Sequence, residues 1–154
     1  MDGRMKSLVY ESPGVGAIVE KAIPRVGENQ MLVRVVSCGI CKGADSAHDT
    51  VGVGSGLAEY PGVTPGHEFA GDVVEVGKCV TAFKLGDRVT ADNTVLCGGC
   101  YYCRTNRPNL CDNFGSIGHN IPGGFAQYVL VNQEKAYRIP EGMSYDDACF
   151  AEPV

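Results

Sequence analysis

Residues 66–80 of this chain read Gly66-His67-Glu68-Phe69-Ala70-Gly71-Asp72-Val73-Val74-Glu75-Val76-Gly77-Lys78-Cys79-Val80. Three valines fall within positions 72–76 and a glycine follows them, which is typical of a short β-strand that ends in a turn. His67 and Glu68 precede this strand, and an imidazole and a carboxylate are both ligands that zinc accepts. The stretch therefore predicts a strand with candidate metal ligands at its start.

Six other segments have the same strand-like composition, and most of them are bounded by glycine, proline or asparagine. They cover positions 8–10, 17–23, 31–38, 88–91, 125–131 and 136–139. In 32–36 the alternation of apolar and polar residues is imperfect, which indicates burial on both faces at one end of the strand. The pattern predicts a mainly β fold, a partly open barrel, with few short helices.

One helix is expected near the end of the chain. Ser144 can cap it, with the acid Asp147 three residues later, and the helix would continue through 148–150. Pro153 disfavours a helical conformation at Glu152, so Glu152 should lie at the end of this helix with its carboxylate free.

Composition excludes several classes of protein. The chain has 154 residues, 13 basic and 18 acidic side chains, a net charge of −5 and 44% hydrophobic residues. This fits one globular domain and argues against nucleic acid as a partner. No stretch approaches the roughly 20 apolar residues of a membrane helix, and no secretory signal is recognisable at the N-terminus. We therefore expect a cytoplasmic protein that does not bind membranes.

Four of the eight cysteines form a compact cluster with the spacing C-x2-C-x2-C-x7-C: Cys97, Cys100, Cys103 and Cys111. Closely spaced thiolates can surround a tetrahedral zinc ion without help from elsewhere in the fold. Disulfides are the alternative in a secreted loop, and an iron–sulfur cluster is disfavoured because the closing C-x3-C-P pattern is missing. The spacing predicts a small structural zinc lobe at 97–111, whose four thiolates leave no open coordination position.

The other four cysteines are Cys38, Cys41, Cys79 and Cys149. Cys38 and Cys41 form a C-x2-C pair that is weak evidence for a redox pair or half of a second zinc site. We interpret Cys38, Cys79 and Cys149 as packing residues. Cys41 is different, because with His67 and one or two carboxylates it would make a metal site with a position open for water or substrate.

The region around His67 resembles the GHE-x2-G-x5-G-x2-V signature of zinc-containing medium-chain alcohol dehydrogenases. The resemblance continues, in the family's order, through these motifs: 38–41, 85–89, the four-cysteine lobe, 123–128 and 151–154. It implies that residues 1–154 are the GroES-like catalytic domain and that the nucleotide-binding domain is absent. The pair Glu152-Pro153 matches the polyol branch, which includes sorbitol dehydrogenases.

This resemblance implies two zinc ions per chain, with NAD or NADP in the full-length enzyme. The catalytic zinc would be held by Cys41, His67 and a carboxylate, with Glu68 and Glu152 as the candidates. One carboxylate would ligate directly, while the other holds zinc-bound water or enters during ligand exchange. The zinc polarises the hydroxyl of a secondary alcohol or sugar alcohol, which then transfers hydride to the cofactor. Asp45 is the acid expected to orient His67.

The sequence departs from the family after Cys41, where one extra residue has entered and Gly43 stands where a serine or threonine commonly relays the proton. Ser46 or His48 could take that role, and both could equally be exposed loop residues. The glycine-rich stretch 51–56 is interpreted as a loop, because no helix pattern follows it as a nucleotide fingerprint requires.

The expected partner is a small alcohol or polyol, and the full-length enzyme is expected to be a homo-oligomer. These 154 residues alone should show no dehydrogenase turnover. Two other functions stay open: a stand-alone zinc-stabilised barrel that binds a ligand, and a thiol-based redox or metal-sensing module. Zinc content separates them, because the dehydrogenase reading requires two ions and loss of one on Cys41→Ser.

Overall fold

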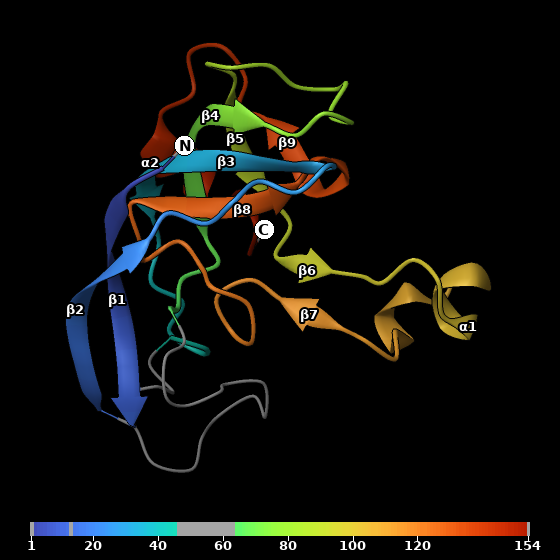
Figure 1. Ribbon diagram of the computed structural model, residues 1–154, viewed down its shortest axis with the longest axis horizontal. Coiled ribbons are helices and arrows are strands. Elements are labelled where there is room, and N and C mark those ends of the chain that lie inside the picture. The colour runs from blue at the N-terminus through green and yellow to red at the C-terminus, as the bar shows by residue number, and fades with distance from the viewer. Residues whose placement is uncertain (1, 13, 46–63, 154) are drawn as a thin grey trace.

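The computed structural model describes residues 2–12, 14–45 and 64–153 (Figure 1). The strands are β1 (Arg4–Ser12), β2 (Val15–Ala22), β3 (Gln30–Cys38), β4 (Phe69–Val76), β5 (Arg88–Ala91), β6 (Thr94–Val95), β7 (Gly115–Ser116), β8 (Tyr128–Asn132) and β9 (Ala136–Arg138). The helical segments are α1 (Tyr101–Arg104), η2 (Pro108–Leu110), η3 (Gln133–Lys135), α2 (Tyr145–Ala148) and η4 (Cys149–Ala151). The mainly β prediction is confirmed, and all seven predicted strands are present.

Five strands form one antiparallel sheet in the order β8-β3-β4-β5-β9. Among the described residues no ladder joins β8 to β9, so the barrel is open, as expected. The β1–β2 hairpin stands against one end of this sheet (Figure 1). The hairpin is attached to the sheet through the segment before β8, where the Leu8 N–H donates to the Phe125 carbonyl at 2.8 Å.

The core lies where β3, β4, β5 and β8 face one another. Its buried side chains are Met31, Val33, Phe69, Val73, Val89, Ala91, Ile117, Val129 and Val131. Three consecutive residues of β3, positions 31–33, are fully buried. This confirms burial on both faces at the start of that strand. Gly71 of β4 lets the two strands approach, because a Cβ there would overlap the Arg34 carbonyl.

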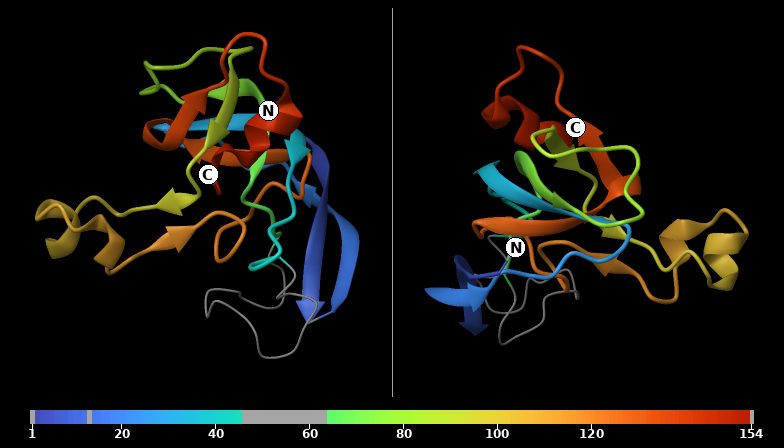
Figure 2. Two further views of the ribbon diagram at one scale, coloured as in Figure 1. Left: turned by 180° about the vertical axis from the view of Figure 1, so that it is seen from behind. Right: turned by 45° about the horizontal axis from the view of Figure 1, so that its top comes forward.

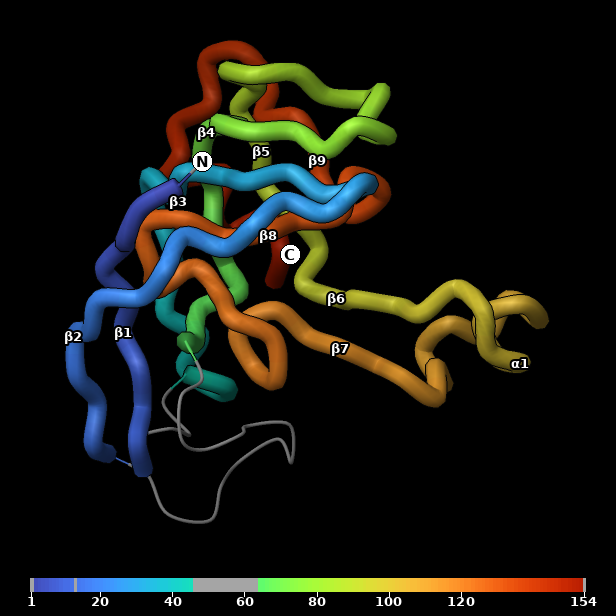
Figure 3. The backbone as a smooth tube through the Cα atoms, viewed as in Figure 1, coloured from blue at the N-terminus to red at the C-terminus, as the bar shows by residue number. Residues whose placement is uncertain are grey.

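The four-cysteine lobe projects from the barrel (Figures 1, 2 and 3). Strands β6 and β7 pair at its base, with Thr94 opposite Ser116, and α1 and η2 lie at its tip. The sequence did not predict these two-residue strands, because so short a pair carries no periodic signal. The lobe itself is where the cysteine spacing placed it.

The predicted C-terminal helix is present as α2 followed by η4. The Ser144 side chain accepts a hydrogen bond from the Asp147 N–H at 3.0 Å, so Ser144 is the N-cap. Glu152 does end the helical segment, but its backbone is helical, with φ −69° and ψ −47°. Pro153 disfavours this conformation without preventing it, and the prediction that Glu152 lies at the end of the helix is confirmed. The preference against the α region before proline is steric and moderate, and the packing of the preceding turn overrides it.

Two of the remaining cysteine assignments can be compared with the structure. Cys149 is 2% exposed and packs with Ala70, Ile139 and Ala148, as predicted. Cys79 is exposed, which contradicts its assignment as a packing residue. It lies in the turn after β4, where its N–H donates to the Glu28 carbonyl at 2.9 Å. None of the described helices has the length and apolar character that crossing a bilayer requires.

Candidate metal centres

The first cluster of metal-ligand residues lies between the ends of two paired strands. Cys38, the last residue of β3, is opposite Phe69, the first residue of β4. The antiparallel pairing therefore brings the segment after β3, with Cys41, next to the segment before β4, with His67 and Glu68. Ligand atoms of these three side chains all lie within 4.8 Å of one another. His67 and Glu68 are buried, and Cys41 is half-buried.

Asp45 supports this cluster from the loop that carries Cys41. Its Oδ2 accepts the Cys41 N–H at 2.9 Å, and the Ala44 N–H points to the Cys41 Sγ at 3.4 Å. Its Oδ1 lies 3.8 Å from the His67 Nδ1, which is within ion-pair range but too long for a hydrogen bond. Both of these buried atoms lack a hydrogen-bond partner among the described residues.

The donor set of this cluster fits a zinc ion. A thiolate, an imidazole and a carboxylate converge in a largely buried place, which is the ligand chemistry of open zinc sites. The unpaired Asp45 Oδ1 and His67 Nδ1 face each other, so a small closure would form the acid–imidazole contact that fixes a metal-bound histidine.

A second histidine lies against the first one. The rings of His67 and His119 have centroids 4.8 Å apart and are tilted by 31°. His119 is 8% exposed, and its Nδ1 is 3.0 Å from the Ser116 Oγ. Sequence reasoning missed His119, because it lies between the lobe and β8 in a stretch with no ligand spacing, and only the fold brings it to His67.

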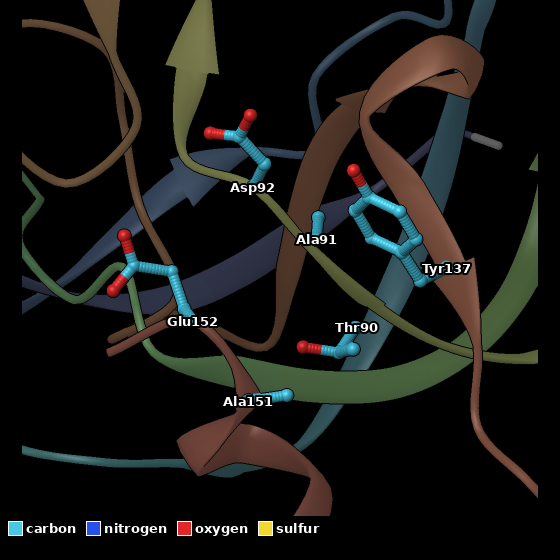
Figure 4. Close-up of a pocket in the computed structure, with 6 residues that line it drawn as sticks. All are labelled: Thr90, Ala91, Asp92, Tyr137, Ala151 and Glu152. Carbon is cyan, nitrogen blue, oxygen red and sulfur yellow. The ribbon is translucent and has the colours of Figure 1, made fainter. Parts of the chain in front are cut away.

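Glu152 does not join the converging group among the described residues. Glu152 lines a pocket of about 340 Å³ together with Thr90, Ala91, Asp92, Tyr137 and Ala151. Figure 4 shows the carboxylates of Glu152 and Asp92 on the same side of this pocket. Burial raises the pKa of Glu152, the carboxylates of Glu68 and Asp92 raise it further, and His67 opposes them. Glu152 is therefore close enough to sense the cluster electrostatically.

Cys38 does not share the chemistry of Cys41. Burial raises the pKa of the Cys38 thiol far above its usual range, and its Sγ lies 3.7 Å from the Gly39 carbonyl. A buried neutral thiol is a poor nucleophile and a poor metal ligand. Packing of Cys38 against the core agrees with its predicted role as a packing residue.

The second cluster is the four-cysteine lobe. All four sulfur atoms lie within 4.8 Å of one another, with Cys97 Sγ at 3.5 Å from Cys111 Sγ and 4.0 Å from Cys103 Sγ. Sulfurs at the corners of a tetrahedron around zinc, each about 2.3 Å from the ion, are about 3.8 Å apart. The lobe has nearly this geometry, so the four cysteines could hold a zinc ion.

Backbone N–H groups in the lobe donate to cysteine sulfurs and so stabilise thiolates that can bind a cation. The Cys100 N–H donates to the Cys97 Sγ, and the Cys103 N–H donates to the Cys100 Sγ, both at 3.4 Å. Hydrogen bonds from Cys100 and Gly99 lower the pKa of Cys97 to about 6, and those from Cys103 and Asp112 lower that of Cys100. Partial burial and the neighbouring thiols raise the pKa of Cys103 to about 12. The backbone donors therefore favour the thiolate form at Cys97 and Cys100.

Two of the predicted site residues, Ser46 and His48, lie outside the described residues, as does the glycine-rich stretch 51–56. Their predicted roles stay predictions.

Comparison with known proteins gives one family. The family of the alcohol dehydrogenase GroES-like domain matches residues 27–141. A sorbitol dehydrogenase from Halalkalibacterium halodurans is 37% identical, over 97% of this chain and 43% of its own. An L-threonine 3-dehydrogenase from Xanthomonas axonopodis pv. citri is 36% identical, over 97% of this chain and 44% of its own. The chain therefore spans less than half the length of the curated relatives it matches.

A solved structure of another protein also matches this chain. An alcohol dehydrogenase (rspB) from Escherichia coli CFT073, in complex with NADH, superimposes with a TM-score of 0.84 at 34% identity, over 97% of this chain and 42% of its own.

Proposed function

Since this chain belongs to the family of alcohol dehydrogenase GroES-like domains, we propose that it is the zinc-binding catalytic part of an NAD(P)-dependent alcohol or polyol dehydrogenase. The observation that carries the proposal is the convergence of Cys41, His67 and Glu68 within 4.8 Å. These three residue types, brought together by two adjacent strands, leave a coordination position for a substrate oxygen.

Cys41, His67 and Glu68 would hold the zinc, and Glu152 would be the second candidate carboxylate near it. When bound, zinc would polarise the substrate hydroxyl so that it loses its proton near neutral pH. The chain's own residues orient this site. Asp45 fixes the Cys41 backbone at 2.9 Å and faces the His67 Nδ1, which leaves the opposite ring nitrogen, Nε2, for the ion.

The second zinc would be structural. The lobe at 97–111 offers four thiolates and no open position, so it would stabilise the fold without taking part in the reaction. We assign residues 1–154 to one GroES-like catalytic domain that includes this lobe. Free cysteines that serve as metal ligands persist in a reducing compartment, which supports a cytoplasmic location.

A sugar alcohol is the substrate class that the pair Glu152-Pro153 favours, and a relative named as a sorbitol dehydrogenase agrees with it. Glu152 and Asp92 add hydrogen-bond acceptors beside a pocket of about 340 Å³, which suits a ligand rich in hydroxyl groups. Hydride acceptance by NAD or NADP, a proton relay through Ser46 or His48, and a homo-oligomer of the complete protein belong to the same proposal.

Zinc analysis tests the proposal on this chain. The purified protein should contain two zinc ions, and Cys41→Ser should contain one. Cys79→Ser is the matched control, because Cys79 is exposed and belongs to neither cluster. This variant should keep both ions. A single ion in the unmodified protein, unaffected by Cys41→Ser, would favour a zinc-stabilised binding module instead.

A further inference from the structure

Gly39 lies in the loop that connects β3 to the candidate ligand Cys41. Its N–H donates to the backbone carbonyl of Glu68 at 2.7 Å, so the loop and the start of β4 are joined here. The backbone of Gly39 is outside the positive-φ region, in which glycine has its conformational advantage. A larger residue could therefore adopt the same backbone conformation. If glycine is required at this position, the reason is the limited space around its Cα.

That space is occupied by a metal-ligand side chain. A Cβ added at Gly39 would overlap the Oε2 of Glu68, and it would lie 3.2 Å from the Glu68 Cβ and 3.1 Å from the Cε1 of Phe150. Glu68 comes from the segment before β4 and Phe150 from η4, so two distant parts of the chain meet at this glycine. The Glu68 carboxylate thus lies against the bare Cα of Gly39.

The exposure and flexibility of the neighbouring side chains determine how such an overlap would be relieved. Phe150 is 51% exposed, so its ring can move outward at little cost. Oε2 is the end of a flexible side chain, and rotation about the Glu68 side-chain torsions would remove its overlap. The contact with the Glu68 Cβ at 3.2 Å needs only a backbone shift of a few tenths of an ångström. The fold can therefore tolerate a methyl group at position 39, but the carboxylate cannot keep its place.

We propose that Gly39 is a positioning residue for Glu68, whose missing side chain allows the carboxylate to reach the metal shared with Cys41 and His67. This rests on the proposed function, because it assumes that the cluster binds a metal ion. The geometry predicts that Gly39→Ala weakens metal binding at this site and leaves the fold and the four-cysteine lobe unchanged.

The test is a titration of the metal-free protein with Co²⁺, followed by visible absorption, with the affinity of the signal that disappears in Cys41→Ser as the readout. Gly39→Ala should weaken this binding by about 10- to 100-fold, the range found when residues that orient metal ligands are changed. Gly43→Ala is the matched control. Gly43 lies in the same loop, and among the described residues the nearest atom to a Cβ added there is the Cys41 Sγ at 4.0 Å. This variant should bind Co²⁺ as the unmodified protein does.

A double-mutant cycle with Glu68→Ala identifies the cause. In that background the carboxylate is gone, so adding Gly39→Ala should change the remaining affinity by less than about twofold. The double variant has no carboxylate to displace, so it also tests the idea if Gly39→Ala alone folds poorly.

The proposal about Gly39 is overturned if Gly39→Ala binds Co²⁺ as tightly as the unmodified protein, or if it causes the same loss with and without Glu68. The proposed function fails in a different way, namely if the unmodified protein shows no Co²⁺ signal that depends on Cys41. The two failures are therefore distinguishable in one set of titrations.

Discussion

The two clusters of metal ligands differ in how far apart their residues lie in the sequence. The four cysteines of the lobe fall within 97–111, and their sulfurs meet around one short turn and two helical turns. Cys41, His67 and Glu68 come from the ends of two strands and meet because β3 pairs with β4. The lobe is exposed and has almost no apolar core, whereas the second cluster lies beside the buried core of the barrel.

This difference determines what each cluster depends on. Without a core, the lobe has little to offset the conformational entropy of ordering its chain, so we expect the metal to supply its stability. The Cys41 cluster has its ligands placed by packed strands, so we expect the fold to exist without the metal. A change in the barrel should therefore disturb the second cluster and spare the lobe, and a change in the lobe should do the reverse.

The largest effect is expected for Cys111→Ser. Cys111 is the buried cysteine of the lobe, with its Sγ 3.5 Å from that of Cys97. Structural zinc in small modules contributes about 10–16 kcal/mol of binding free energy, so loss of one thiolate should release the ion and unfold 97–111. Hydrogen exchange should accelerate in the lobe alone, with one zinc retained. Acceleration throughout the barrel would contradict the independence of the two clusters.

A core substitution should have the opposite pattern. Phe69 is fully buried and directly follows Glu68. Phe69→Ala should destabilise the barrel by about 3–5 kcal/mol in urea unfolding and weaken metal binding at the Cys41 cluster. Metal in the lobe should persist. Leu85→Ala, at a side chain that is 62% exposed, is the control and should be close to neutral. Equal loss from both clusters would contradict the comparison.

A smaller, local effect is expected for Asp45→Asn. The change weakens the acceptor of the Cys41 N–H and removes the charge that faces the His67 Nδ1. Metal affinity at this cluster should fall by about 10- to 100-fold, with the lobe unaffected, as measured by competition with a chelator. Unchanged affinity would show that Asp45 does not orient His67. Glu141→Gln, on an exposed turn, is the control.

The smallest effect is expected at the N-cap of α2. Ser144→Ala removes the bond to the Asp147 N–H and should cost about 1 kcal/mol of the free energy of unfolding. Ser144→Asn should retain most of this stability, because an asparagine caps equally well and adds no charge beside the Asp147 carboxylate. Chemical denaturation of the three proteins measures the effect. A loss in both variants would point to the contact of the Ser144 Oγ with the Asp147 carboxylate instead.

How much the sequence could predict follows from the same contrast. The lobe was predictable because all its ligands are close in sequence, and the strands were predictable from their valine-rich composition and turns. The neighbourhood of His67 was only partly predictable. His119 and Gly39 meet His67 and Glu68 through contacts between segments that are distant in sequence, and no local pattern contains such contacts. The helical backbone at Glu152 and the exposure of Cys79 likewise depend on tertiary packing.

The most direct test of the two-cluster account is urea unfolding of the protein loaded with two Co²⁺ ions, followed by visible absorption. Tetrathiolate and mixed-ligand cobalt sites absorb differently, so each cluster reports its own state. Two transitions are expected, in which the signal that depends on Cys41 disappears together with the β-sheet and the signal of the lobe persists to higher urea. Simultaneous loss of both signals, or earlier loss of the lobe signal, would contradict this expectation.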